Sequence, residues 1–277
     1  MPAAQALPLV VALAVAFLIA GPTLRALSAS GLERDNYRRR RLPLPGGVII
    51  AAAAALALIP LAALDELAGA GLLPKDLGPV ALYVFGVAFL GLFDDLLAGE
   101  PRGWRGHGAA VLRGGLSSGA LKAAGSLGLA LFALAGQGLS PPHYLLAVAV
   151  LVLATNLFNL LDLRPGRSFK LFVVLGAALT VAAWDVRPLA DLGLFVGPAL
   201  VVGLYDIRER AMLGDTGSNM LGALAGWWIV LSLPPAGQLV AVAVMLVVTV
   251  YGEFRSISQL VDRNPLLRRL DSLGRPG

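Results

Sequence analysis

The chain has 277 residues, of which 57% are hydrophobic and only 14% charged, and its mean hydropathy is +0.79. This composition excludes an ordinary soluble globular domain and indicates an integral membrane protein. The absence of cysteine excludes disulfides and thiolate ligands, and we interpret the net charge of +5 as orientation in the membrane and attraction to anionic lipid rather than nucleic-acid binding.

Nine apolar stretches are predicted to span a membrane as helices, which satisfy their own backbone hydrogen bonds in lipid. The stretches are continuously apolar, unlike the alternating strands of an outer-membrane barrel. In chain order they cover residues 5–24, 46–64, 79–97, 118–136, 143–161, 171–186, 189–205, 216–233 and 236–252. We therefore predict an all-α bundle of about nine transmembrane helices, with Ala and Gly suited to close helix packing.

The basic residues predict how this bundle is oriented, because Lys and Arg near span ends are retained in the cytoplasm. Of the 22 Lys and Arg residues, 20 fall on one side, and only Lys75 and Arg187 fall on the other. The first span has its basic cluster after it, the reverse of a cleaved signal peptide. We expect a multi-pass protein of the cell membrane with its N-terminus outside and its C-terminus in the cytoplasm.

The loops are too short for a separate folded domain, so residues 1–277 are interpreted as one transmembrane domain. The Gly-rich, basic segment 99–119, which contains Trp104 and His107, is predicted to be a mobile cytoplasmic loop that binds anions. Residues 254–277 form an amphipathic cytoplasmic tail, which Pro265 is expected to divide into two short helices. Surface anchoring and a substrate role are both open for this tail.

Three clusters of acidic and amide residues interrupt the apolar chain, and all three fall at the predicted cytoplasmic face. The first is Asp94 and Asp95, at the end of the third span. Two adjacent carboxylates near an apolar boundary require a proton or a cation, although a solvated helix end is the alternative.

The second cluster is Asn156, Asn159 and Asp162, at the end of the fifth span. Their i, i+3, i+6 spacing places them within about 120° of one another on a helix. For Asn156 we favour a structural hydrogen bond to a neighbouring helix. Asn159 and Asp162, nearer the cytoplasm, are better placed to bind a metal or a phosphate.

The third cluster surrounds Asp215, which is followed by Thr216, Gly217, Ser218 and Asn219 at the start of the eighth span. A helix cap is the simple interpretation of these residues. The positive end of a helix also attracts phosphate, and a carboxylate there can hold a magnesium ion that bridges to it. Together the three clusters predict a site for a charged substrate.

With these motifs the chain resembles the polyprenyl-phosphate N-acetylhexosamine-1-phosphate transferase superfamily (glycosyltransferase family 4), which includes the phospho-N-acetylmuramoyl-pentapeptide transferases. The resemblance covers most of the chain and rests on Asn36-Tyr-Arg38, Pro43 to Gly47, Gly91-Leu-Phe-Asp-Asp95, Asn156-Leu-Phe-Asn-Leu-Leu-Asp162 and Met212-Leu-Gly-Asp-Thr-Gly-Ser218. It implies magnesium-dependent transfer of a sugar-1-phosphate from a UDP-sugar to a polyprenyl phosphate, such as undecaprenyl phosphate, with release of UMP in peptidoglycan or surface-glycan synthesis.

The resemblance also implies roles for single residues. Asp215 and Asn159 would hold magnesium, and Asp94 or Asp95 would orient or deprotonate the attacking lipid phosphate. Lys122 would bind phosphate, and Asp162 would belong to the catalytic group. The residues expected to bind substrate are Asn36, Asn156, Asn159, Met212 and Ser218.

Three positions depart from the pattern of this superfamily. Leu163 stands where a Gly usually follows the Asp, Met212 replaces an aromatic that stacks on uracil, and the tail lacks the histidine motif of many bacterial members. A catalytically silent relative or a polyprenyl-phosphate binding or transport protein is therefore the alternative. The pattern of the CDP-alcohol phosphotransferases is absent from the sequence. A homodimer is left open, because lipid-facing and dimer surfaces look alike.

Overall fold

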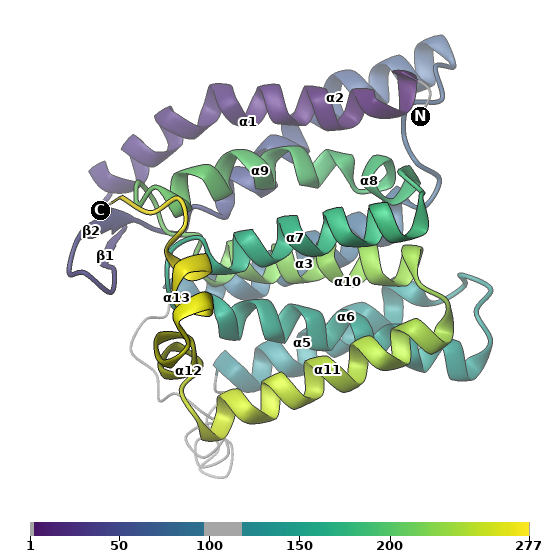
Figure 1. The fold of residues 1–277 in the computed structure, drawn as a ribbon. Coiled ribbons are helices and arrows are strands. Elements are labelled where there is room, and N and C mark those ends of the chain that lie inside the picture. The colour runs from purple at the N-terminus through teal and green to yellow at the C-terminus, as the bar shows by residue number, and fades with distance from the viewer. Residues whose placement is uncertain (1–2, 97–117, 277) are drawn as a thin grey trace.

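A computed structural model describes residues 3–96 and 118–276 of the chain, which form a helical bundle with one small hairpin (Figure 1). The hairpin strands are β1 (Glu33–Asp35) and β2 (Arg41–Pro43). The helices are α1 (Ala3–Ala29), α2 (Val48–Ala68), α3 (Leu77–Leu96), α5 (Ser118–Leu134), α6 (Pro141–Leu161), α7 (Arg167–Ala183), α8 (Arg187–Asp191), α9 (Gly193–Ile207), α10 (Gly214–Ser232), α11 (Pro235–Phe254), α12 (Ile257–Arg263) and α13 (Pro265–Ser272).

Helix covers most of each of the nine apolar stretches, which confirms a helical protein of the membrane class. Five helices are long and apolar enough to cross a bilayer: α1 from Gln5 onward, α2, α3, α6 and α11. The apolar helices 119–134 and 193–207 are shorter than a typical span. The seventh stretch is divided between α8 and α9.

Helix α10 forms the centre of the bundle and packs most extensively against α6 and α3. Almost all of its residues from Gly214 to Ile229 are buried. Its glycines permit this close packing: a Cβ at Gly222 would meet the backbone of Ala154 and Thr155 on α6, and one at Gly226 would meet Leu151. Because α10 packs against α3 and α6, these contacts position the residues at its start.

Different elements lie at the two ends of the bundle (Figure 1). The N-terminus lies at one end, whereas the hairpin, α12, α13 and the C-terminus gather at the other. The two termini therefore lie at opposite ends of the bundle. Helix α11 lies at the edge of the bundle and exposes apolar side chains, including Val240, Val247 and Phe254.

The hairpin was not predicted, because three-residue strands carry too little alternation to be recognised in sequence. Its strands are antiparallel, with Glu33 opposite Pro43 and Asp35 opposite Arg41. The Asn36 Oδ1 atom closes the turn by accepting hydrogen bonds from the backbone N–H groups of Arg38 (2.8 Å) and Arg40 (3.0 Å). The turn therefore depends on an asparagine within the basic cluster.

The tail forms two short helices divided at Pro265, as predicted. The Asn264 side chain caps the second helix by accepting hydrogen bonds from the N–H groups of Leu266 and Leu267, at 3.0 and 3.2 Å. The predicted anion-binding loop, with Trp104 and His107, lies outside the described residues except for positions 118 and 119 at the start of α5.

Candidate functional site

The end of α3 contacts the start of α10 so closely that only glycine fits between them. A Cβ atom at Gly91 would overlap the backbone of Asp215, and a Cβ at Gly214 would lie 2.7 Å from Oδ2 of Asp95. Gly214 also has a positive φ of 71°, which glycine adopts without strain. These glycines bring the first and third acidic clusters together.

Asp95 acts as a cap for α10. Its Oδ1 atom accepts a hydrogen bond from the N–H of Asp215 at 2.9 Å, and its Oδ2 atom accepts from the N–H and hydroxyl of Thr216 at 2.8 and 2.7 Å. The residue is only 8% exposed, so these donors replace its water. A carboxylate at the positive end of a helix is favourable, and its oxygens are occupied by the fold.

Lys122 on α5 joins the other acidic residues of the same two clusters. Its Nζ atom lies 3.0 Å from Oδ2 of Asp94 and 2.5 Å from Oδ2 of Asp215. The side chains of Lys122, Asp94 and Asp215 are 20%, 27% and 31% exposed, respectively, so solutes can reach them. The two adjacent aspartates of α3 thus differ: Asp95 faces the protein, and Asp94 faces a partly open group of charges.

Asn159 on α6 reaches this group through Ser218. The Asn159 Nδ2 atom donates to the Ser218 hydroxyl at 3.2 Å, and that hydroxyl donates to the backbone oxygen of Asp215 at 3.4 Å. An asparagine and a serine from the predicted site are therefore in contact. We define the polar cluster as Asp94, Lys122, Asn159, Asp215 and Ser218.

Asp162 lies directly after α6, beside the polar cluster. Burial and the negative charges of Asp206 and Asp215 raise the pKa of Asp162 well above its usual range. The carboxylate of Asp206 in turn accepts hydrogen bonds from the N–H of Gly166 at 2.6 Å and of Leu213 at 3.3 Å. Asp206 therefore ties the loop after α6 to the segment before α10.

Two of the residues predicted to bind substrate make structural hydrogen bonds instead, and the side chain of a third makes no hydrogen bond within the described residues. Asn36 closes the hairpin turn and donates to buried Glu209 at 3.3 Å. The backbone of Met212 pairs with Pro43 and Gly46, at 3.0 and 2.7 Å. Asn156 is exposed, and within the described part of the chain its side chain forms no hydrogen bond. The structural hydrogen bond that we favoured for Asn156 is therefore not seen.

The structure adds residues to the site that the sequence did not single out. Arg34 on β1 donates to the backbone oxygen of Asp95 at 2.6 Å, which places a guanidinium at the end of α3. Asp206, in the last turn of α9, and Glu209, just after that helix, are buried acids. Because the chain has few charged residues, an acid next to an apolar stretch was the signal that the sequence offered for both residues. The sequence could not reveal their hydrogen-bond partners, because these are distant along the chain.

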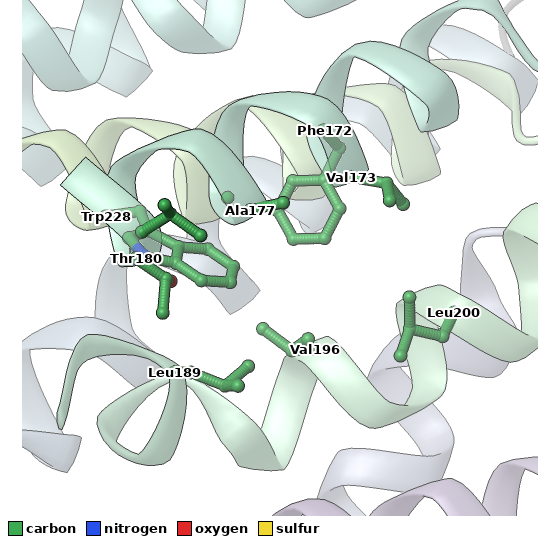
Figure 2. A pocket seen from close by; sticks show the side chains of 10 residues that line it. Phe172, Val173, Ala177, Thr180, Leu189, Val196, Leu200 and Trp228 are labelled. Atoms are coloured by element: carbon green, nitrogen blue, oxygen red, sulfur yellow. The ribbon is translucent and has the colours of Figure 1, made fainter. Parts of the chain in front are cut away.

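A separate apolar cavity of about 260 Å³ lies among α7, α8, α9 and α10 (Figure 2). Phe172, Leu189, Val196 and Trp228 point into it, and Thr180 is the only hydroxyl-bearing residue in its wall. No residue of the polar cluster lines this cavity. A wall of this kind suits hydrocarbon and lacks the groups needed to handle phosphate.

The donor atoms of the polar cluster are chemically suited to magnesium, which prefers oxygen ligands and is usually held by one or two carboxylates with water and phosphate. Asp94 and Asp215 supply carboxylates, and Asn159 supplies an amide oxygen. Over residues 3–96 and 118–276, no three Asp, Glu, His or Cys side chains are arranged to enclose a metal. The donor set therefore fits a metal shared with a phosphate ligand better than a site closed by protein.

The excess of negative charge around the polar cluster also favours a bound metal ion. Lys122 is paired with Asp94 and Asp215, and Arg34 lies near Asp95, whereas Asp162 has the acidic neighbours Asp206 and Asp215. Burial raises the pKa of Asp162, and the negative charges of Asp206, Asp215 and Asp95 raise it further. A divalent cation would offset this excess of negative charge.

Comparison of the chain with protein-family models and with curated proteins gives no match.

Proposed function

We propose that the protein is a membrane enzyme that transfers a sugar-1-phosphate from a UDP-sugar to a polyprenyl phosphate. One observation carries the proposal: Lys122 bridges Asp94 and Asp215, which belong to two of the predicted clusters and to different helices. A cation between two partly exposed carboxylates, beside an asparagine, provides the groups that phosphate chemistry requires.

The proposed reaction is a phosphoryl transfer, in which positioning and charge neutralisation supply most of the rate enhancement. An oxygen of the lipid phosphate attacks the sugar-bearing phosphorus, the bond from that phosphorus to the UMP oxygen breaks, and UMP leaves. The lipid phosphate is already largely ionised near neutral pH, so little proton removal is needed. Asp94 is then a residue that orients the attacking phosphate rather than a strong base.

Three residues of the polar cluster, Lys122, Asp215 and Asn159, have further parts in this proposal. Lys122 moves from its carboxylates to the transferred phosphate and neutralises its charge. Asp215 and Asn159 would hold magnesium, which when bound would supply positive charge against the donor pyrophosphate. Asp95 keeps Asp215 in place through the cap on α10.

We further propose that the apolar helices form about nine spans, with the polar cluster at the cytoplasmic face of the cell membrane. The hairpin and the tail lie at the same end of the bundle (Figure 1) and are rich in arginine, and Arg34 of the hairpin donates to the backbone oxygen of Asp95, next to Asp94. A nucleotide sugar would reach the cluster from the cytoplasm, and a polyprenyl phosphate would reach it from the lipid.

The direct test is release of UMP by the purified protein with magnesium, undecaprenyl phosphate and a panel of UDP-sugars. We expect one donor class to react and chelation of magnesium to stop the reaction. Asp215→Asn should lower turnover by about 100-fold or more, because a metal ion contributes several kcal/mol. Asp191→Asn on α8 is the matched control and should remain active, since Asp191 lies outside the polar cluster.

The same assay separates the alternative, a binding or transport protein without catalysis. In that case undecaprenyl phosphate would bind, no UDP-sugar would release UMP, and Asp215→Asn would change only binding. That result would refute the enzymatic proposal.

A further inference from the structure

The tail helices α12 and α13 are fixed to the bundle by their polar side chains. Arg167, which is 8% exposed, donates to the two carboxylate oxygens of Asp271 at 2.9 and 3.2 Å. Arg164 donates to those of Asp262 at 2.8 and 2.7 Å. Arg275 adds a hydrogen bond to the backbone oxygen of Pro165 at 2.8 Å. The polar face of the tail is thus already used within the chain.

Five leucine side chains of the tail are left exposed by the bundle. The leucines Leu260, Leu266, Leu267, Leu270 and Leu273 are 37% to 65% exposed. On α13, Leu266 and Leu270 lie one turn apart and therefore share a face, and Leu273 follows directly after the helix end. We call the side chains of Leu260, Leu266, Leu267, Leu270 and Leu273 the leucine ridge. A helix that packs on a protein normally buries its apolar face. The exposed leucine ridge therefore indicates that another apolar partner covers these side chains.

Exposed arginines accompany the leucine ridge. Arg255, Arg263, Arg268 and Arg269 are all exposed, and none of them forms an ion pair with another residue of the described segments. Arg268 and Arg269 lie between the leucines of α13. Leucines on one face with cations beside them match the surface of a bilayer that contains anionic lipid.

The position of the tail in the fold supports the same partner. The tail follows directly from α11, whose outer face exposes Val240, Val244, Val247 and Phe254. That face and the leucine ridge therefore belong to consecutive helices of one chain. A second copy of the tail is a poorer partner, because a symmetric contact would bring the two sets of arginines together.

We propose that α12 and α13 form a binding surface for anionic phospholipid headgroups, with the leucine ridge inserted at the membrane interface. The ion pairs of Arg167 and Arg164 then connect this lipid-bound surface to the loop that carries Asp162. The proposal does not depend on the reaction at the polar cluster.

The chain lacks cysteine, so a single introduced cysteine can report the environment of the tail. A fluorophore or spin label at Leu270→Cys is followed in nanodiscs of phosphatidylcholine, with and without phosphatidylglycerol. The label should move from water to lipid as phosphatidylglycerol is added, and Leu266→Cys should repeat this result one turn away. Ser272→Cys, away from the ridge, should stay exposed to water.

Loss of two arginines tests the charge dependence. Because each basic residue near an anionic surface contributes about 1 kcal/mol, R268Q/R269Q should weaken the lipid-inserted state by about 30-fold. The midpoint should move to a higher phosphatidylglycerol content, whereas the control Lys75→Gln at the opposite end should leave it unchanged. A Leu270 label that stays in water in both lipids, or an R268Q/R269Q midpoint equal to that of the unmodified tail, would overturn the proposal.

Discussion

The Nζ atom of Lys122 lies 2.5 Å from Oδ2 of Asp215, although 93 residues separate the two in the chain. The same nitrogen lies 3.0 Å from Oδ2 of Asp94. Lys122 therefore holds two carboxylates that would otherwise repel each other, and it is the residue on which the proposed function most directly depends.

Replacing Lys122 with Gln should separate substrate chemistry from metal binding. The loss of its positive charge should lower kcat by about 100-fold, as for other single donors that stabilise a transition state. It should also tighten the apparent affinity for magnesium, because Asp94 and Asp215 lose their shared cation. UMP release measured against magnesium concentration gives both values.

The control for this prediction is Lys75→Gln, at the opposite end of the bundle, where neither quantity should change. If Lys122→Gln instead weakens magnesium binding and leaves kcat intact, Lys122 does not bind the transferred phosphate.

The adjacent residues Asp94 and Asp95 should respond differently to alanine. Asp95→Ala removes the acceptor for two N–H groups and one hydroxyl at the start of α10, so it should cost about 2 kcal/mol of stability and lower Tm. Asp94→Ala should leave Tm nearly unchanged but reduce turnover. Thermal unfolding in detergent measures the contrast, and equal Tm values for the two variants would contradict the capping role.

The close contact at Gly91 makes a third prediction. Gly91→Ala should destabilise the protein by about 1–3 kcal/mol, because the new Cβ atom overlaps the backbone of Asp215 and forces α3 away from α10. Gly128→Ala on α5 is the matched control: no atom lies within 4 Å of its Cβ position, so alanine should be neutral or stabilising there. Unfolding midpoints of both variants test the difference.

The tail contact should depend on pH through Asp271. Burial acts to raise the pKa of Asp271, but hydrogen bonds from Arg167 and Arg275 outweigh it and hold the pKa at about 2. Because this pKa is below the unfolded value of about 3.9, the contact contributes fully above about pH 4 and is lost as the pH falls toward 2. Hydrogen exchange of α12 and α13 across this range should show the release.

Removal of the same carboxylate should release the tail at neutral pH. Asp271→Asn leaves the buried Arg167 without its partner, a loss of about 3–5 kcal/mol for a buried pair. Asp262→Asn breaks a more exposed pair and should cost no more than about 1 kcal/mol. Similar exchange rates in the two variants would show that Asp271 does not fix the tail.

The sequence by itself determined the membrane class, the positions of the apolar helices and the division of the tail at Pro265, because hydropathy, helical spacing and proline act over one or two turns. It also identified Asp94, Asn159 and Asp215 as candidates, since polar groups in an apolar chain are costly, whereas Lys122 was implied by the family resemblance. The roles of these residues in catalysis and metal binding remain predictions of the resemblance.

Only the tertiary structure decided which of these candidates meet. It placed Asp95 at the start of α10, Asp94 within hydrogen-bonding distance of Lys122, and Asn156 on an exposed surface. It also supplied the partners of Asp206, Glu209 and Asp271, which are 30 or more residues away in sequence in Gly166, Asn36 and Arg167. Such pairings depend on how helices pack around α10, and helix packing is set by the fit of distant side chains and glycines rather than by any local pattern.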